Sequence, residues 1–230
     1  MRAMLGQSLY LQWKTMRWPL VPFVLAAFGV PLLALRQAHA AAVVAPFSAA
    51  ENVLYALQYW TLLFPLTAAL LGITFGLSAW SWDHRTHHVY ALSLPLARWE
   101  YALLKFAAGV AFVLIPVVAL LAGTLLGLAG LDVPDGLHAY PFAFAFRFLL
   151  AVLIAYAVGF AAASSTVRTA IWILSAYLAF LILGSLAVGF AREALGMTDL
   201  LTPLDIMGRM LARWPGPFHV FGGNWMPIDV

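Results

Sequence analysis

Long apolar segments without a single charged residue constrain the fold of this chain more than any other feature. A helix of about 20 apolar residues is long enough to cross the hydrocarbon core of a bilayer. Five long segments contain no Lys, Arg, Asp or Glu: Trp18–Leu35, Asn52–Trp82, Phe106–Leu131, Phe148–Val167 and Thr169–Ala191. We therefore predict five transmembrane helices, at about residues 18–35, 58–82, 106–131, 146–167 and 169–191. The second segment is longer than one span needs, so its Asn52–Trp60 end is expected at the membrane interface.

The composition agrees with an all-α, polytopic integral membrane protein. Hydrophobic residues make up 64% of the chain and charged residues 9%, against about 25% charged in soluble domains. A chain with so few charged residues cannot cover the surface of a soluble globular protein with polar groups. A disordered protein is also excluded, because disordered chains are polar and highly charged. The segments also lack the alternation of a membrane β-strand, whereas a helix satisfies its own backbone hydrogen bonds in lipid. We expect one transmembrane domain, residues 1–191, and a tail, residues 192–230.

Small residues inside the predicted spans indicate close helix packing. Two Gly-x-x-x-Gly pairs, Gly72/Gly76 and Gly123/Gly127, place glycines on one face of a helix. Such pairs let two helix backbones approach closely.

The basic residues predict the orientation of the spans. With a cytoplasmic N-terminus, the inner segments hold Arg2, Lys14, Arg17, Arg85, Arg98, Lys105 and Arg168, while the outer segments before the tail hold Arg36 and Arg147. Cytoplasmic loops are enriched in Lys and Arg. We therefore predict a multi-pass protein of the cell membrane, with the N-terminus in the cytoplasm and the tail outside.

Residues 1–17 are predicted to form an interfacial helix. One face carries Leu5, Leu9, Trp13 and Met16, and another carries Gln7, Lys14 and Arg17. This amphipathic pattern is typical of helices that lie at a membrane surface. A cleaved signal peptide is the alternative, because Ala38-His39-Ala40 resembles a cleavage site. The preceding apolar segment is longer than the usual signal core of about 7–15 residues, which favours the interfacial helix.

The predicted cytoplasmic loop Asp83–Lys105 concentrates charges and histidines. Pro95 disfavours helix at Leu94, and a new helix can begin with Pro95 or Leu96 in its first turn. That helix would continue through Lys105 into the third span, with Tyr101 and Lys105 one turn apart. A short element joined rigidly to two membrane helices can transmit force from a cytoplasmic partner.

This loop resembles the corresponding loop in the membrane subunits of type-2 ABC exporters. The resemblance rests on a span that ends in an acidic residue and on Leu94-Pro95-Leu96-Ala97-Arg98-x-x-Tyr101-x-x-x-Lys105. The interfacial helix and the loop's position between spans two and three also match, over roughly residues 1–190.

The resemblance implies a permease subunit that moves an unidentified substrate. Such a subunit forms a homo- or heterodimer, and two cytoplasmic ABC ATPase subunits dock on the loop between spans two and three. The implied ATPase-coupling loop contains His84, Arg85, Tyr90, Leu94, Pro95, Arg98, Tyr101 and Lys105.

Two features depart from that family. Ala97 stands where members usually have Ser or Thr, and no apolar segment after residue 191 is long enough for the usual sixth span. A membrane scaffold or accessory subunit of a larger complex is therefore the alternative function. An intramembrane enzyme that uses the histidines is a third possibility.

The remaining candidate sites have competing interpretations. His84 and His88 are spaced to share a metal ion on a helix, but a solvated loop without metal is the favoured interpretation. Arg147 lies in an apolar segment near the outer side, where it can snorkel to headgroups or bind an anionic substrate group.

Several chemistries are not expected from this chain. It has no Cys for a thiolate or a Cys-ligated metal. The Walker pattern fails because Trp13, not Gly, precedes Lys14-Thr15. We expect no cofactor, no nucleic-acid partner and no catalysis, with ATP hydrolysis on a partner chain.

The tail mixes turn formers with aromatic residues. Trp214–Phe218 and Phe221–Trp225 carry this pattern, and Leu204–Ala212 suggests a short amphipathic helix. Because aromatic residues favour the membrane interface, the tail is expected to pack on the outer surface. A plain external loop and a partner-binding segment both remain open.

Overall fold

The computed structural model describes residues 2–44, 48–85, 97–165, 167–195, 201–213 and 215–229. The chain divides into two compact units, which are described separately. The first contains Met1–Ala163 and Asn224–Val230, and the second contains Ser164–Gly223.

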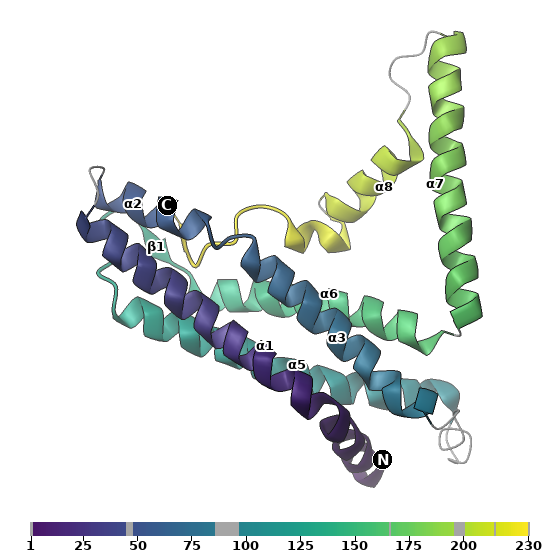
Figure 1. The fold of residues 1–230 in the computed structure, drawn as a ribbon, viewed down its shortest axis with the longest axis horizontal. Coiled ribbons are helices and arrows are strands. Elements are labelled where there is room, and N and C mark those ends of the chain that lie inside the picture. Colours follow the sequence, from purple (N-terminus) through teal and green to yellow (C-terminus); the bar gives the residue numbers. More distant parts are fainter. Residues whose placement is uncertain are drawn as a thin grey trace. The chain divides into compact units, whose positions relative to one another are not determined.

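The first unit is built from helices that lie along one another (Figure 1). These are α1 (Arg2–Val44), α2 (Ala49–Gln58), α3 (Leu63–Arg85), α5 (Arg98–Ala129) and α6 (Pro141–Ser164). Over the described residues, four stretches are long and apolar enough to cross a membrane: Ser8–Val43, Ala49–Arg85, Trp99–Ala129 and Pro141–Ser164. The expected all-α, membrane-type architecture is therefore confirmed in these helices.

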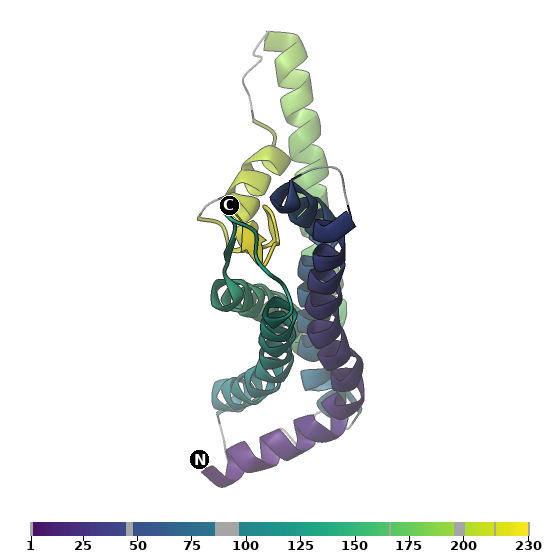
Figure 2. The ribbon, with the colours of Figure 1, turned by 90° about the vertical axis from the view of Figure 1, so that its left-hand side faces the viewer.

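Helix α1 joins the predicted interfacial helix and the first predicted span. It is one continuous helix that contains Pro19, Pro22 and Pro31. Each proline removes a backbone hydrogen bond and bends a helix, and Figure 2 shows the N-terminal part of α1 turned away from the rest. On the predicted apolar face Met16 is buried but Trp13 is 46% exposed, while Lys14 and Arg17 on the predicted basic face are exposed. The predicted apolar face is therefore matched only at Met16, and the buried side also includes the polar Gln12.

The second charge-free segment, whose Asn52–Trp60 end was expected at the membrane interface, is divided into two helices. Helix α2 covers the first part, and a turn over residues 59–62 separates it from α3. Ser48 caps α2 by accepting a hydrogen bond from the backbone N–H of Glu51, whose carboxylate accepts one from the N–H of Ser48. This reciprocal cap fixes where α2 begins.

The glycine pairs pack helices within the first unit, as predicted. A Cβ added at Gly72 or Gly76 would collide with the backbone of α6, at Val152 and Phe160 respectively. Gly123 lies equally close to the backbone of Phe28 in α1. The pairs therefore set the contacts of α3 with α6 and of α5 with α1.

A two-stranded ribbon closes one end of the first unit, which we call the ribbon end. Strand β1 (His138–Ala139) pairs antiparallel with β2 (Ile228–Asp229). Ile228 has no exposed surface and belongs to an apolar cluster with Leu35, Val53 and Leu137. The last residues of the predicted tail are thus part of the first unit, although the sequence placed the domain boundary near residue 191.

The second unit contains α7 (Val167–Leu195), α8 (Pro203–Ala212) and the 3-10 helix η1 (Pro217–Phe221). Thr202 and Asp205 cap α8 reciprocally, and α8 is the short helix expected in the tail. The fifth predicted span falls in α7, where the described apolar stretch Leu178–Ala191 is shorter than a membrane span.

Candidate functional site

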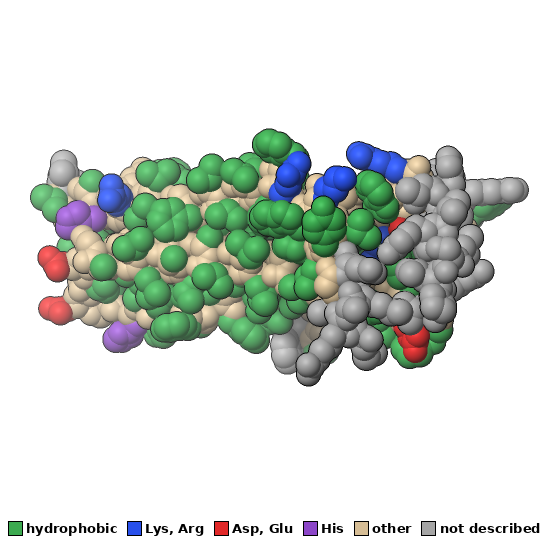
Figure 3. Space-filling model, turned by 90° about the horizontal axis from the view of Figure 1, so that it is seen from below, with side chains coloured by type: hydrophobic (Ala, Val, Ile, Leu, Met, Phe, Trp, Pro, Cys, Tyr) green, Lys and Arg blue, Asp and Glu red, His purple; other side chains and the backbone are tan. Residues whose placement is uncertain are grey.

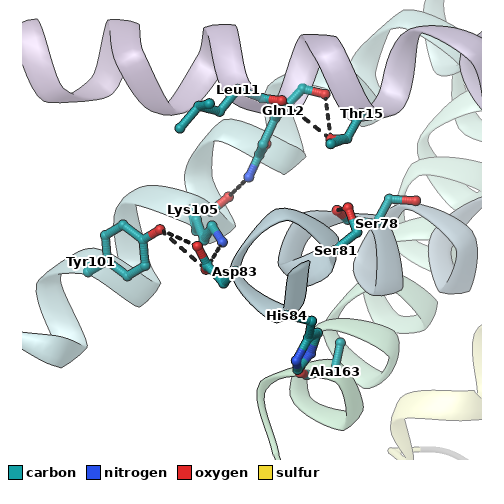
Figure 4. A network of polar contacts seen from close by, with 10 residues as sticks. All are labelled: Leu11, Gln12, Thr15, Ser78, Ser81, Asp83, His84, Tyr101, Lys105 and Ala163. Atoms are coloured by element: carbon teal, nitrogen blue, oxygen red, sulfur yellow. Dashed lines mark hydrogen bonds and ion pairs between the residues drawn. The ribbon is translucent and has the colours of Figure 1, made fainter. Parts of the chain in front are cut away.

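A buried polar cluster lies at the end of the first unit where α3 ends and α5 begins, which we call the loop end (Figure 4). Its centre is Asp83, two residues before the end of α3, which has no exposed surface. The Asp83 carboxylate forms an ion pair with the Lys105 ammonium. It also accepts a hydrogen bond from the Tyr101 hydroxyl, at 3.0 and 3.2 Å to its two oxygens.

The Lys105 ammonium is enclosed by aromatic rings as well as by the carboxylate. It lies 4.5 Å from the ring centroid of Trp80 and 5.2 Å from that of Tyr101. Ring faces attract cations, and more strongly where water is excluded. Only 5% of Lys105 is exposed, so the charge is compensated by Asp83 and these two rings together.

Gln12 brings α1 into the same cluster. Its side-chain Nε2 donates a hydrogen bond of 2.7 Å to the backbone carbonyl of Lys105, across 93 residues of sequence. Gln12 is 2% exposed. Among the described residues, the Oε1 atom of Gln12 and the Nε1 atom of Trp80 are buried without a hydrogen-bond partner. Three helices, α1, α3 and α5, are therefore tied together at the loop end.

The cluster joins the two ends of the predicted coupling loop. Asp83 lies just before the last residue of α3, Arg85, and Tyr101 lies in the first turn of α5. A buried charge left without its partner costs about 3–5 kcal/mol. Separating the end of α3 from the start of α5 would therefore strand a buried charge, which favours movement of the two helices as a unit.

The predicted coupling residues fall into three groups. Tyr101 and Lys105 lie one turn apart on α5, as predicted, but both are buried, so they support the loop rather than offer a surface to a partner. His84 and Arg85 are exposed, and the His84 Nε2 atom lies 2.8 Å from the carbonyl oxygen of Ala163. Tyr90, Leu94 and Pro95 lie outside the described residues.

Arg98 is the first residue of α5, so this helix begins slightly later than the sequence indicated. Ala97 precedes it in an extended conformation, and its N–H donates a hydrogen bond of 3.4 Å to the Glu100 carboxylate. From Arg98 the helix continues into the apolar span without a break, as predicted. The predicted continuity of one helix from this region through Lys105 into the third apolar segment is therefore confirmed from Arg98 onward.

The predicted metal alternative receives no support from the described ranges. Within 48–85 and 97–165, as in the other described ranges, no three His, Asp or Glu side chains form a group that could hold a metal ion. His88, the second histidine of the predicted pair, lies outside the described residues.

Arg147 has a role that the sequence did not predict. Its Nη1 donates a hydrogen bond of 2.6 Å to the carbonyl of Asn224, and the guanidinium lies 4.4 Å from the ring centroid of Trp225. Trp225 is 1% exposed and meets the ring of Phe144 edge to face at 6.1 Å. Arg147 therefore anchors the end of the tail to α6.

The sequence analysis did not predict several residues of these sites: Gln12, Trp80, Asp83, Asn224 and Trp225. Only Asp83 had a usable signal in the sequence. Asp83 directly follows one charge-free segment and Lys105 directly precedes the next. Two opposite charges at the same end of neighbouring apolar helices are a signal from which their pairing could have been predicted. Trp225 lies in an aromatic segment, but nothing in its spacing points to Arg147.

Comparison with protein-family models, curated proteins and solved structures finds no match to this chain.

Proposed function

We propose that this chain is the permease subunit of an ABC exporter, which moves an unidentified substrate with energy from a separate ATPase subunit. The observation that carries the proposal is the buried cluster of Asp83, Tyr101 and Lys105. It joins both ends of a basic loop to three apolar helices. A partner that pushes on such a loop moves the helices, which is what coupling of ATP hydrolysis to transport requires.

The proposal includes five membrane crossings, the fifth in α7. Helix α6 has 24 residues, and at 1.5 Å per residue it extends about 36 Å, enough to cross a hydrocarbon core of about 30 Å. It begins beside the ribbon end and ends at the loop end, near His84. The chain is back at the ribbon end by Asn224, which binds Arg147.

The segment between Ser164 and Asn224 must therefore return across the membrane an odd number of times. Helix α7, with 29 residues, is long enough for that return. Because the loop end carries the basic residues, the proposal places it and the N-terminus in the cytoplasm. The ribbon end and the tail then lie outside.

The test is association with an ATPase from the neighbouring reading frame. Arg98→Glu reverses a charge in the first turn of α5 and is expected to weaken co-purification of the ATPase about tenfold or more, through repulsion across a partly desolvated contact. Leu94→Asp is expected to act similarly. If both positions serve docking alone, neither change alters the thermal stability of the chain, since exposed charges in general contribute little to stability.

Arg36→Glu is the matched control, since Arg36 is an exposed base in α1 at the opposite end of the unit. Normal ATPase association and ATP hydrolysis in both loop variants would remove the coupling assignment. Loss of association in the Arg36 control as well would show a general charge effect, and would also count against the proposal.

A scaffold or accessory subunit is the second candidate function. Helix α7 favours it, because large apolar side chains are exposed along its length: Trp172, Phe180, Leu183 and Phe190 are 64–70% exposed. Such a surface suits partner helices as well as lipid. Stable co-purification with another membrane protein, without any ATPase, would favour this alternative.

A further inference from the structure

The outward face of the N-terminal part of α1 carries a basic and aromatic stripe. Its members are spaced by four, three, one and three residues, which places them on one side of a helix. They are Tyr10, Lys14, Arg17, Trp18 and Val21, all exposed. The opposite side of the same turns is occupied, because Gln12, Met16 and Leu20 are buried in the first unit.

The two bases of the stripe lie against aromatic rings. The Lys14 ammonium is 5.5 Å from the ring centroid of Trp82 on α3, and the Arg17 guanidinium is 5.5 Å from that of Trp18. Within the described part of the chain, no carboxylate lies within 4.0 Å of either base. Asp83 pairs with Lys105, so among the described residues Lys14 and Arg17 have ring contacts but no carboxylate partner.

The stripe continues into an apolar surface that suits acyl chains. The charge-free segment begins at Trp18, and Val21 and Leu25 continue the same face at 54% and 66% exposure. Figure 3 shows basic side chains set among hydrophobic ones on the surface of the molecule. Bases and Trp or Tyr side chains beside an apolar span are typical of the headgroup level of a membrane.

We propose that Lys14 and Arg17 bind the phosphate headgroup of an anionic phospholipid, with the rings of Trp18 and Trp82 beside it and an acyl chain along Val21 and Leu25. Residues three apart on a helix are neighbours, about 5–6 Å apart at Cβ, so both bases reach one phosphate. A zwitterionic lipid brings its own cation to the site, so an anionic lipid is preferred.

The bound lipid also acts on the buried cluster. Gln12 projects from the same helical turns as Lys14, on the opposite side, and holds the backbone of Lys105. A lipid that fixes these turns at the membrane surface therefore stabilises the contact of α1 with α5. This inference needs a membrane-embedded chain but does not depend on coupling to an ATPase.

Native mass spectrometry of the purified chain with added phosphatidylglycerol and phosphatidylcholine tests the proposal. The unmodified chain is expected to retain phosphatidylglycerol in preference to phosphatidylcholine. Lys14→Gln together with Arg17→Gln should weaken phosphatidylglycerol retention about 30-fold, since each base near an anionic lipid surface contributes about fivefold. The charge-preserving pair Lys14→Arg and Arg17→Lys should retain it.

Arg36→Gln is the matched control, an exposed base on the same helix at the ribbon end, and should leave retention unchanged. Equal retention by the unmodified chain and the double Gln variant would overturn the site. A second measurement needs no variant: the preference for phosphatidylglycerol should fall when salt is raised from about 50 to about 500 mM. A preference that is absent, or that persists unchanged in high salt, also overturns the proposal.

Discussion

Asp83 is a charged side chain with no exposed surface, so its neighbours must compensate its charge. Lys105 supplies the opposite charge and Tyr101 a hydrogen bond. A buried ion pair is poor evidence of net stabilisation, because apolar residues of the same volume often do as well. Its effect appears when one partner is removed. The intact pair adds little net stability, but the loss of one partner is costly. This difference makes the pair suitable for keeping α3 and α5 together during movement.

Because removing one partner of the Asp83–Lys105 pair costs more than replacing both, a double-mutant cycle has a defined expected outcome. Asp83→Leu and Lys105→Met should each lower the free energy of unfolding by about 3–5 kcal/mol, because each leaves the other charge buried without a counter-ion. Tyr101→Phe should cost only about 1 kcal/mol, the value of one hydrogen bond. Asp83→Leu combined with Lys105→Met should be close to neutral. Denaturant unfolding in detergent micelles measures all of these variants. If the effects of Asp83→Leu and Lys105→Met simply add in the double variant, the two charges do not interact.

Residue-scale prediction from sequence succeeded where the relevant partners are close in the chain. Tyr101 and Lys105 are neighbours because helical periodicity places residues i and i+4 on one face. The Asp83–Lys105 and Gln12–Lys105 contacts join residues 22 and 93 positions apart, on different helices. Local periodicity carries no information about which helices meet, so these contacts required the folded chain.

At the scale of elements, close backbone contacts decide how the helices pack. Gly76 meets the backbone of Phe160 and Tyr156 in α6, which leaves no room for a side chain. The pairing motif predicted close approach but not the partner helix. The prolines lie inside α1 without ending it, whereas the turn after α2 separates that helix from α3. The excess length of the second apolar segment indicated that it holds more than one span needs, but the sequence indicated neither the position of the turn nor the continuity of α1.

The contact of Gly76 with the α6 backbone predicts that two Gly→Leu substitutions differ sharply in their effect on stability. Gly76→Leu should force α3 away from α6 and lower stability by about 1–3 kcal/mol or more, the usual cost of overpacking. Gly29→Leu makes the same chemical change in α1, where nothing lies within 4 Å of an added Cβ. It should leave the thermal unfolding midpoint in detergent nearly unchanged. Equal effects of the two substitutions would contradict the packing of α3 on α6.

At the scale of the whole molecule, the ends of the first unit are defined by contacts distant in sequence. The ribbon end depends on β1 pairing with β2, about 90 residues later along the chain. The sequence predicted an aromatic tail at the outer surface, and aromatic composition is general evidence for such a location. It did not indicate that Asn224 and Trp225 would be held by Arg147, because that contact has no periodic signal.

The position of Asn224 predicts which side of the membrane each end of α7 occupies. Ser164 lies at the loop end of α6, and Gly222 precedes the residues that return to the ribbon end. Because the chain contains no Cys, Ser164→Cys and Gly222→Cys each introduce a single reactive thiol. An impermeant maleimide added outside intact cells should label Gly222→Cys only, and Ser164→Cys should react after the membrane is opened. Arg85→Cys serves as a second inner marker.

Labelling of Ser164→Cys and Gly222→Cys from the same side would mean that α7 does not cross the membrane. Since α6 would then have to leave both of its ends on that side, the same result would also remove the proposed crossing of α6.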